Sequence, residues 1–498
     1  MKELKVEQFS NRWGIVLASL GMAIGAGNLW RFPRLAGQYG GTFIILWILF
    51  LFIWSIPLLL AEFSIGKRFR QGVIGSYSQL AGKKMTFLGF FIALCTLGIA
   101  FYYSVVTAWA LRYLGFSVLN IFPATAVSPS ELQNTTYLDE YWNGISGGSW
   151  LTVFLFVSVI IVAVYILSKG ISNGLEKANR ILIPSLFVML LIVSFLSLGM
   201  RNGVLGLEYM FSIKPALFSE PIVWIEALSQ SAWSTGAGWG LLMTLSSYSR
   251  QNEDVTLNTF IGAFGNNTAS LLAGMAILPA VFALSASEAE AVSYLQTGNQ
   301  ALTFTVIPKL FADIPGGSIL SAVFFLALFL AAFSSLLPMI ELLMGHVVRL
   351  GISRKKAFFI VVLAFVVIGF PSAFNLDFFS NQDWVWGVGL ILSGLFIAMA
   401  VVKHGVGDFK RKLIDQDSDF KVSDRYFAIC IPVNIVLGIV LIYWWLSRGY
   451  SEYPWFDSMG TWNIFDVYSN ASVVTQWGIV IALGFWFNRF LYNKFSQK

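Results

Sequence analysis

The chain has 498 residues, of which 57% are hydrophobic and only 12% charged, and its mean hydropathy is +0.73. Soluble globular domains carry about 25% charged residues, so this composition excludes an ordinary soluble protein and predicts an integral membrane protein. The net charge of +6 is accounted for by lysines and arginines in alternate loops, and it indicates no nucleic-acid partner.

Apolar stretches long enough to cross a bilayer recur along the whole chain, since a spanning helix needs about 20 apolar residues. They begin near Trp13, Thr42, Phe87, Trp150, Ile181, Trp224, Leu257, Ser318, Ala357, Trp384, Tyr426 and Val473. The sequence therefore predicts an all-α membrane protein of about twelve spans, surrounded by membrane lipid.

Positive charges follow the second, fourth, eighth and tenth spans. They are Lys67, Arg68, Arg70, Lys83, Lys84, Lys169, Lys177, Arg180, Arg349, Arg354, Lys355, Lys356, Lys403, Lys410, Arg411 and Lys412. The intervening loops carry Glu131, Asp139, Glu140, Glu288 and Glu290. Because cytoplasmic loops are rich in Lys and Arg, we expect a multi-pass protein of the plasma or inner membrane with both termini in the cytoplasm.

Two spans are interrupted by glycine-rich segments, at residues 21–28 in the first span and 230–240 in the sixth. Glycine is a poor helix former, and backbone left unpaired at membrane depth is tolerated only where it is buried in protein or lines a cavity. Interrupted spans at corresponding positions in two halves of a chain are typical of the binding site of a secondary transporter.

Unwinding at 23–27 and at 234–238 would expose backbone N–H groups, which bind a carboxylate, and carbonyl groups, which bind a hard cation such as sodium. Further neutral oxygens near the breaks belong to Asn28, Ser234, Asn266, Ser334 and Ser335. This set suits sodium and lacks the Cys or His ligands of a zinc site. Each serine alone is better explained by a hydrogen bond to its own helix, so the prediction rests on the joint pattern.

Charges inside the spans are a second indication of function, because each is costly in a membrane. Glu62, Glu226 and Glu341 are the acidic examples, with interfacial placement as the alternative. Arg31 follows the first break and Asp377 precedes the tenth span, and the two either close over a substrate as an ion pair or are unrelated interfacial charges. The spans show no catalytic triad, aspartate dyad or zinc motif, so we expect no enzyme.

Several motifs together resemble a known family. They are Arg12-Trp13-Gly14, the run from Gly25-Ala26-Gly27-Asn28 to Trp30-Arg31-Phe32-Pro33, Tyr102-Tyr103, Trp233-Ser234 through Trp239-Gly240, and Ala331 to Ser335. They resemble the neurotransmitter:sodium symporters of bacterial type, which share the leucine-transporter fold. The resemblance implies two inverted five-helix repeats, here 1–200 and 221–404, with the first and sixth helices broken and 425–492 peripheral. It implies sodium-coupled import by alternating access in a monomer or dimer.

The resemblance also implies the site residues. The first sodium would be held by Ala23, Asn28, Ser234 and Asn266 together with the substrate carboxylate. The second sodium would be held by Gly21, Ile24, Ala331, Ser334 and Ser335. The substrate would contact Met22, Ala23, Gly25, Ala26, Gly27, Ile99, Tyr103, Trp233, Ser234, Gly236, Trp239, Ser335 and Met339. Arg31 and Asp377 match the outer gate, with Asp383 as a nearby rival for the acid.

Two departures from the family pattern leave questions open. The inner gate of the family pairs an N-terminal arginine with an aspartate, whereas this chain offers Lys5-Val6-Glu7 on one side and His346 to Arg349 on the other. Trp47 stands where chloride-dependent relatives carry a tyrosine, although four further residues fit a chloride site. These are Gln230, Ser234, Asn266 and Ser270.

The substrate is the least determined feature. Gly25 stands where monoamine carriers of the family place an aspartate, which favours an amino acid. Two indoles at Trp233 and Trp239 wall the side-chain end, and Gly236 three residues before the second resembles the pattern of the family's glycine carriers, which implies glycine or alanine. The alternatives are a larger hydrophobic or aromatic amino acid that fills space beside Gly236 and Gly238, and proton coupling through Glu62 or Glu226. A channel or a receptor without transport is a further alternative.

Overall fold

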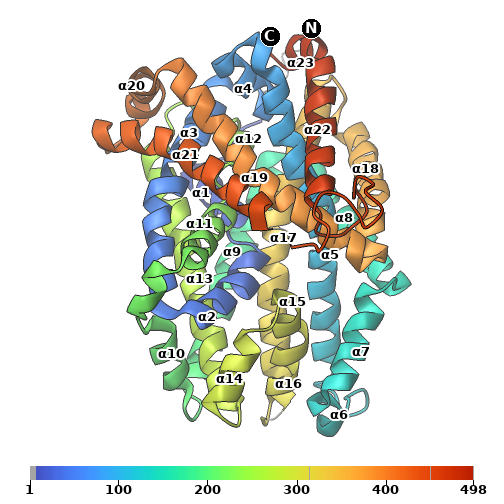
Figure 1. The fold of residues 1–498 in the computed structure, drawn as a ribbon. Coiled ribbons are helices and arrows are strands. Elements are labelled where there is room, and N and C mark those ends of the chain that lie inside the picture. The colour runs from blue at the N-terminus through green and yellow to red at the C-terminus, as the bar shows by residue number, and fades with distance from the viewer. Residues whose placement is uncertain (1–6, 313, 449, 497–498) are drawn as a thin grey trace.

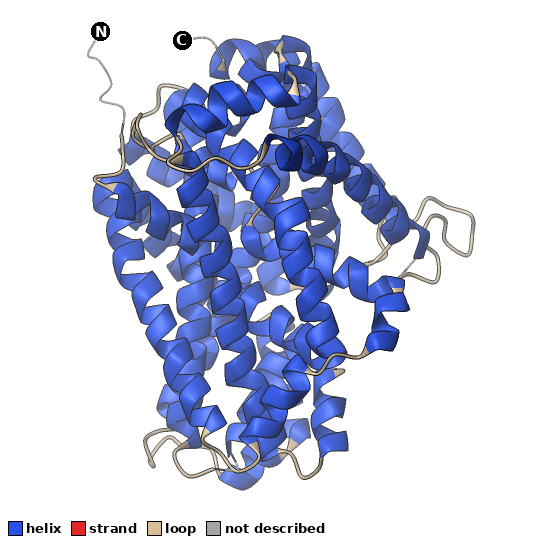
Figure 2. Ribbon diagram, turned by 90° about the vertical axis from the view of Figure 1, so that its left-hand side faces the viewer, coloured by secondary structure: helices blue, strands red, loops and turns tan. Residues whose placement is uncertain are grey.

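The computed structural model describes residues 7–312, 314–448 and 450–496, and within these ranges it is built of helices with no assigned strand (Figure 2). Its described part contains nine runs long and apolar enough to cross a membrane, and a bent helix pair adds a tenth. The predicted all-α membrane class is therefore confirmed.

The helices of the nine runs pack as one bundle (Figure 1). They are α2 (Ala26–Phe50) with α3 (Ile56–Phe69), α5 (Thr86–Leu119), α8 (Trp150–Ser168), α9 (Lys177–Leu198), α13 (Val255–Leu284), α17 (Gly317–Arg349), α18 (Arg354–Phe374), α19 (Leu376–His404) and α21 (Asp424–Arg448). The bent pair is α22 (Asn470–Trp486) and α23 (Asn488–Phe495), at an angle of 66°.

The run that holds α2 and α3 contains two spans, because it is broken at Gly40. This residue has φ 63° and ψ −152°, and a Cβ atom there would lie 2.5 Å from the Ser212 carbonyl oxygen. Only glycine adopts this backbone without strain in so little space. Two other spans are themselves broken, α1 (Arg12–Ala23) leading into α2, and α11 (Pro221–Thr235) leading into α12 (Leu241–Ser246). With these broken spans counted, the bundle agrees with about twelve spans.

The two ends of the bundle differ in charge. The chain termini, α4 (Gly72–Ala81) and α20 (Val406–Phe409) lie at one end in Figure 1, where the loops carry the lysines and arginines. The opposite end holds short helices, of which the first four carry acidic residues. They are α6 (Pro129–Gln133), α7 (Thr135–Ser146), α10 (Gly203–Phe211), α14 (Glu288–Leu295), α15 (Asn299–Ala301) and α16 (Ile307–Ala312). This arrangement matches the charge asymmetry of the sequence.

Apolar side chains cover the outside of the bundle as well as its core. Phe154 on α8, Phe195 on α9 and Phe359 on α18 are each at least 65% exposed. Such a surface is typical of helices that face lipid. The broken helices α1, α2, α11 and α12 lie inside, packed against α3, α9, α13 and α17. The interrupted backbone is therefore shielded from the outer surface by protein.

Candidate functional site: two broken helices and a central cavity

The first break is two residues long. Helix α1 ends at Ala23, α2 begins at Ala26, and Ile24 and Gly25 between them are extended. The break is narrower than the predicted 23–27 because Asn28 caps α2, its Oδ1 accepting from the Gly25 N–H at 2.9 Å. A Cβ atom at Gly25 would lie 2.8 Å from the Tyr103 hydroxyl, so a larger residue does not fit here.

The second break spans residues 236–240, two residues further along the chain than predicted. Gly236, Gly238 and Gly240 all have positive φ, at 73°, 94° and 71°. The Gly238 N–H donates to Oε1 of the fully buried Glu62 at 2.6 Å, so this acid holds the unwound backbone in place. Unwound N–H groups buried away from water need such a partner.

Glycine in the second break does not leave free space. A Cβ atom at Gly236 would lie 3.1 Å from Cε of Met22, and one at Gly238 would lie 2.9 Å from the Cα of Gly394. Met22 and α19 therefore occupy the volume that the alternative of a larger substrate requires.

The residues expected to hold the first sodium converge between the two breaks. With Asn266 oriented so that Oδ1 faces the breaks, this oxygen lies 2.8 Å from the Ser234 carbonyl oxygen and 3.1 Å from that of Ala23. Asn28 Nδ2 donates to the same Oδ1 at 2.7 Å and to Ser270 Oγ at 2.8 Å. In the reversed orientation of the amide, the Asn266 nitrogen faces the breaks and donates to both carbonyl oxygens. The structure thus brings this predicted set together.

The residues expected to hold the second sodium lie on two helices that pack against each other. Gly21 and Ile24 are at the end of α1, and Ala331, Ser334 and Ser335 are in α17, all of them buried. Both serine hydroxyls donate to the Ala331 carbonyl oxygen, at 3.0 and 3.1 Å. These are local helix bonds of the kind that the sequence left as the alternative, and the hydroxyl lone pairs stay available as acceptors.

A cavity of about 200 Å³ lies beside the breaks. Ten of the thirteen predicted substrate contacts line it, namely Met22, Ala23, Gly25, Gly27, Tyr103, Trp233, Ser234, Trp239, Ser335 and Met339. Of the other three, Ala26 donates its N–H to the Tyr103 hydroxyl at 2.9 Å, a Cβ atom at Gly236 would lie 3.1 Å from Cε of Met22, and Ile99 is buried in the core.

Sequence reasoning missed the outer half of this cavity. Its lining includes Tyr102, Val106, Asn299, Gln300, Phe379, Trp384, Gly387 and Trp445. These residues come from α5, α15, α19 and α21, far apart in the chain, and apart from Tyr102 no local motif marks them. The excess of tryptophan, 18 residues in all, was the one signal available.

The acid that pairs with Arg31 is Glu226 and not Asp377. Arg31 Nη2 lies 2.8 Å from Glu226 Oε2 on α11, and it also donates to Ser229 Oγ at 2.9 Å. Asp377 is exposed in the first turn of α19, whereas the rival Asp383 lines the cavity together with Arg31. The expectation failed because α11 packs directly on α2, a contact between segments almost 200 residues apart that sequence order does not reveal.

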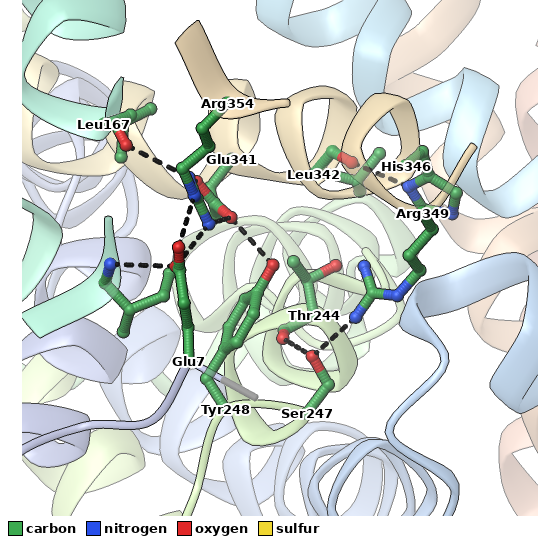
Figure 3. Close-up of polar contacts among 11 residues, drawn as sticks. Glu7, Leu167, Thr244, Ser247, Tyr248, Glu341, Leu342, His346, Arg349 and Arg354 are labelled. Atoms are coloured by element: carbon green, nitrogen blue, oxygen red, sulfur yellow. Dashed lines mark hydrogen bonds and ion pairs between the residues drawn. The ribbon is translucent and has the colours of Figure 1, made fainter. Parts of the chain in front are cut away.

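The end of the bundle that holds both termini is closed by an ion-pair network, drawn in Figure 3. Arg354 donates to both oxygens of the fully buried Glu341 at 2.8 Å, and its Nη2 lies 2.7 Å from Glu7 Oε2. The Tyr248 hydroxyl donates to Glu341 Oε1 at 2.8 Å. The charges are inverted relative to the family pattern, since the N-terminal segment supplies the acid. Lys5 and Val6 lie outside the described residues.

The N-terminal segment is attached at three further points. The Phe9 N–H donates to the Tyr248 carbonyl oxygen at 3.1 Å, and the Ser10 N–H donates to Glu176 at 2.7 Å. Arg12 lies within 3.7 Å of Glu253, Asp254 and Asp419. These contacts join the segment before α1 to the ends of α9, α12 and α13.

The residues considered for chloride are buried beside the first sodium set. Both amide atoms of Gln230 and the indole N–H of Trp47 are buried with no hydrogen-bond partner in the described part of the chain. Ser270 accepts from Asn28, and Ser234 Oγ accepts from Asn266 at 3.1 Å. The described residues contain no group of three or more His, Cys, Asp or Glu that suits a transition metal.

The comparisons with known proteins agree with this geometry. A profile of the Sodium:neurotransmitter symporter family matches residues 6–143 and 137–483. A sodium-dependent transporter of Methanocaldococcus jannaschii is 32% identical over 452 residues, which cover 89% of this chain and 91% of that protein.

Two further matches carry a substrate in their names. The mouse sodium-dependent neutral amino acid transporter B(0)AT2 is 29% identical over 289 residues, which cover 53% of this chain and 39% of that protein. The crystal structure of MhsT in complex with L-phenylalanine aligns with a TM-score of 0.75 and 28% identity, over 88% of this chain and 99% of that one. With its leucine-transporter fold and its sodium-dependent relatives, the chain belongs to the sodium:neurotransmitter symporter family, a family of transporters and not of enzymes.

Proposed function

We propose that the protein is a symporter that uses sodium to import a small neutral amino acid by alternating access. The observation that carries this proposal is that the carbonyl oxygens of Ala23 and Ser234, one from each break, both lie within 3.1 Å of the Asn266 side-chain amide. Carbonyl ends of broken helices bind a hard cation. Sodium is the cation that the family name and the neutral ligand set favour.

The substrate carboxylate completes the first sodium site. It lies at the N-terminus of α2, where the Gly27 N–H and the helix dipole favour a negative group. The Tyr103 hydroxyl lies at this helix N-terminus. It accepts a hydrogen bond from the Ala26 N–H at 2.9 Å and shares a hydrogen bond of 2.8 Å with the Ser335 hydroxyl. The ammonium group faces the carbonyls of the broken segments. The second sodium occupies the predicted oxygens of α1 and α17.

A small side chain fits the inner cavity best. Trp233 and Trp239 meet edge to face with ring centroids 5.4 Å apart, and Met22 fills the space next to Gly236. Glycine and alanine are therefore the favoured substrates. The phenylalanine bound to MhsT supports the alternative of a larger substrate, which requires Met22 to adopt another rotamer.

Sodium coupling is favoured over proton coupling by the family name and the neutral oxygens at the breaks. Of the two candidate proton carriers, Glu226 is paired with Arg31, whereas Glu62 accepts the Gly238 N–H through Oε1 and its Oε2 has no partner among the described residues. Chloride as a further ion is supported by the buried donors of Gln230 and Trp47, which have no hydrogen-bond partner among the described residues. The positive-inside rule supports a plasma or inner membrane protein with both termini in the cytoplasm.

Uptake into proteoliposomes tests the function. We expect radiolabelled glycine or alanine to accumulate only with an inward sodium gradient, and the other amino acids to compete weakly. Replacing external chloride by gluconate, and imposing a pH gradient without sodium, separates the chloride and proton alternatives. Uptake that does not depend on sodium would contradict the proposal. Stronger competition by leucine or phenylalanine than by glycine or alanine would favour the larger substrate.

A further inference from the structure

Asn179, in the first turn of α9, is a buried polar side chain that belongs to none of the predicted ligand sets. Its exposed fraction is zero, and neither Nδ2 nor Oδ1 has a hydrogen-bond partner among the described residues. Leaving a buried amide unpaired costs about 1–3 kcal/mol for each group. The site is therefore stabilised by something that supplies the missing interactions.

The amide of Asn179 is directed at the end of the first broken helix. A Cβ atom at Gly21 would lie 2.8 Å from Oδ1 of Asn179 and 3.3 Å from its Nδ2, so the amide rests directly on the Gly21 backbone. Gly21 lies three residues before Ile24, where α1 stops. The carbonyl of Gly21 belongs to the proposed second sodium site.

Three helices meet at this point. Helices α1, α9 and α17 pack against one another in all three pairs. The proposed ligands of the second sodium come from α1 and α17 alone, which leaves the third wall, α9, without a contribution. Asn179 is the residue of that wall in contact with Gly21, and its oxygen is a neutral ligand of the kind that sodium accepts.

The start of α9 is also irregular. A π-helical turn, Ile171–Glu176, precedes it, and such turns occur frequently at functional sites. Glu176, three residues before Asn179 and on the same face, is buried and bound to Ser10 and Arg180. Polar side chains thus lie along this face of α9, from the end of the bundle that holds both termini as far as Gly21.

We propose that Asn179 is a further ligand of the second sodium ion, which its amide oxygen contacts from the α9 side either directly or through one water. The proposal rests on the sodium-coupled function above and adds one residue to it. Without sodium the Asn179 amide has no partner, and with sodium it has one. The side chain therefore stabilises the sodium-bound state relative to the sodium-free state. The expected consequence is a change in sodium affinity without a loss of the fold.

Asn179→Leu tests this, because leucine has the same number and branching of side-chain heavy atoms and no polar atoms. In sodium-free buffer the variant should unfold at the same temperature as the wild type or higher, since it buries no unpaired amide. The rise in unfolding temperature on adding sodium should shrink. The sodium concentration for half-maximal substrate binding in detergent should increase about tenfold, the equivalent of one lost interaction of about 1.4 kcal/mol.

Ser197→Ala is the matched control, because Ser197 is on the same helix, fully buried and also without a partner. It should leave the sodium midpoint unchanged. If Asn179→Leu does not fold, Asn179→Ala provides the same comparison. If sodium raises the unfolding temperature of the Asn179 variants as much as that of the wild type, and the sodium midpoint is unchanged, this inference alone is overturned. A wild type that sodium does not stabilise would overturn the proposed function, and this inference with it.

Discussion

Asn28 connects the first break to its surroundings on both sides. Its oxygen caps α2 through Gly25, and its nitrogen donates to Asn266 and Ser270. One side chain therefore fixes the break and orients the amide of Asn266. In the proposed sodium site, Asn28 would therefore act on ion binding both as a ligand and through the geometry of its neighbours.

At this scale we expect Asn28→Ala and Ser334→Ala each to abolish sodium-driven uptake. Each removes an oxygen from a small buried cation site, and a loss of about 1.4 kcal/mol or more lowers sodium affinity at least tenfold. The measurement is uptake against sodium concentration. Thr268→Ala is the control, because this exposed hydroxyl bonds only to its own helix, two residues from Asn266. Normal sodium-driven uptake in both site variants would mean that the ligands were misassigned.

Trp239→Ala should enlarge the inner cavity and admit leucine-sized substrates. The indole is 5% exposed and packs edge to face on Trp233, so its removal leaves a void next to Met22. Competition uptake with glycine, alanine and leucine measures the change. If leucine competes no better in the variant than in the wild type, Trp239 does not set the size limit.

At the scale of elements, the two broken helices follow from sequence because several glycines close together inside an apolar span weaken the helix at that point. Their boundaries do not follow, since they depend on contacts made elsewhere. Asn28 shortens the first break and Glu62 holds the second one at Gly238. The partner of Arg31 was misassigned for the same reason: α11 lies beside α2, and only the packed structure brings Glu226 within 2.8 Å.

The outer ion pair should respond to Glu226 more than to Asp377. Glu226→Gln removes the charge next to Arg31, so we expect uptake to fall several-fold, while the exposed Asp377→Asn should have little effect. Asp383→Asn is measured in parallel, since Asp383 lines the cavity with Arg31. Charge exchange between Arg31 and Glu226 should recover part of the activity, as coupled positions do. A larger loss in Asp377→Asn than in Glu226→Gln would contradict this pairing.

Closure by the N-terminal segment should depend on Glu7. Glu7→Gln weakens one of the two ion pairs of Arg354 and leaves the pair with buried Glu341 intact. Amide hydrogen exchange over residues 7–12 should therefore become several-fold faster, because the segment detaches more often. Arg411→Gln is the control, since its pair with Asp408 is exposed. Unchanged exchange in Glu7→Gln would show that Phe9, Ser10 and Arg12 hold the segment without it.

On the scale of the whole molecule, the charge asymmetry of the loops and the arrangement of the helices agree. The short helices with acidic residues lie at one end and the termini with the basic loops at the other (Figure 1). Composition and periodicity were sufficient for this level of structure. They were not sufficient for the outer cavity, where Trp384 and Trp445 come from separate helices.

Cysteine labelling tests the orientation. Cys95 and Cys430 are both buried, so the wild type should react little with an impermeant maleimide. Glu140→Cys at the acidic end should be labelled in intact cells, and Lys356→Cys at the other end only after permeabilisation. Both positions are exposed. The reverse pattern would place the termini outside the cell.

Arg354 has one partner that is shielded from solvent and one that is not, and this makes closure sensitive to ionic strength. Glu341 is fully buried, whereas the Glu7 side chain is 39% exposed. Dissolved salt screens exposed charges far more than buried ones. A higher salt concentration at this end therefore weakens the ion pair between Glu7 and Arg354, while Arg354 stays paired with Glu341. The ionic strength of the surrounding solution then becomes one of the factors that set how often the N-terminal segment is released.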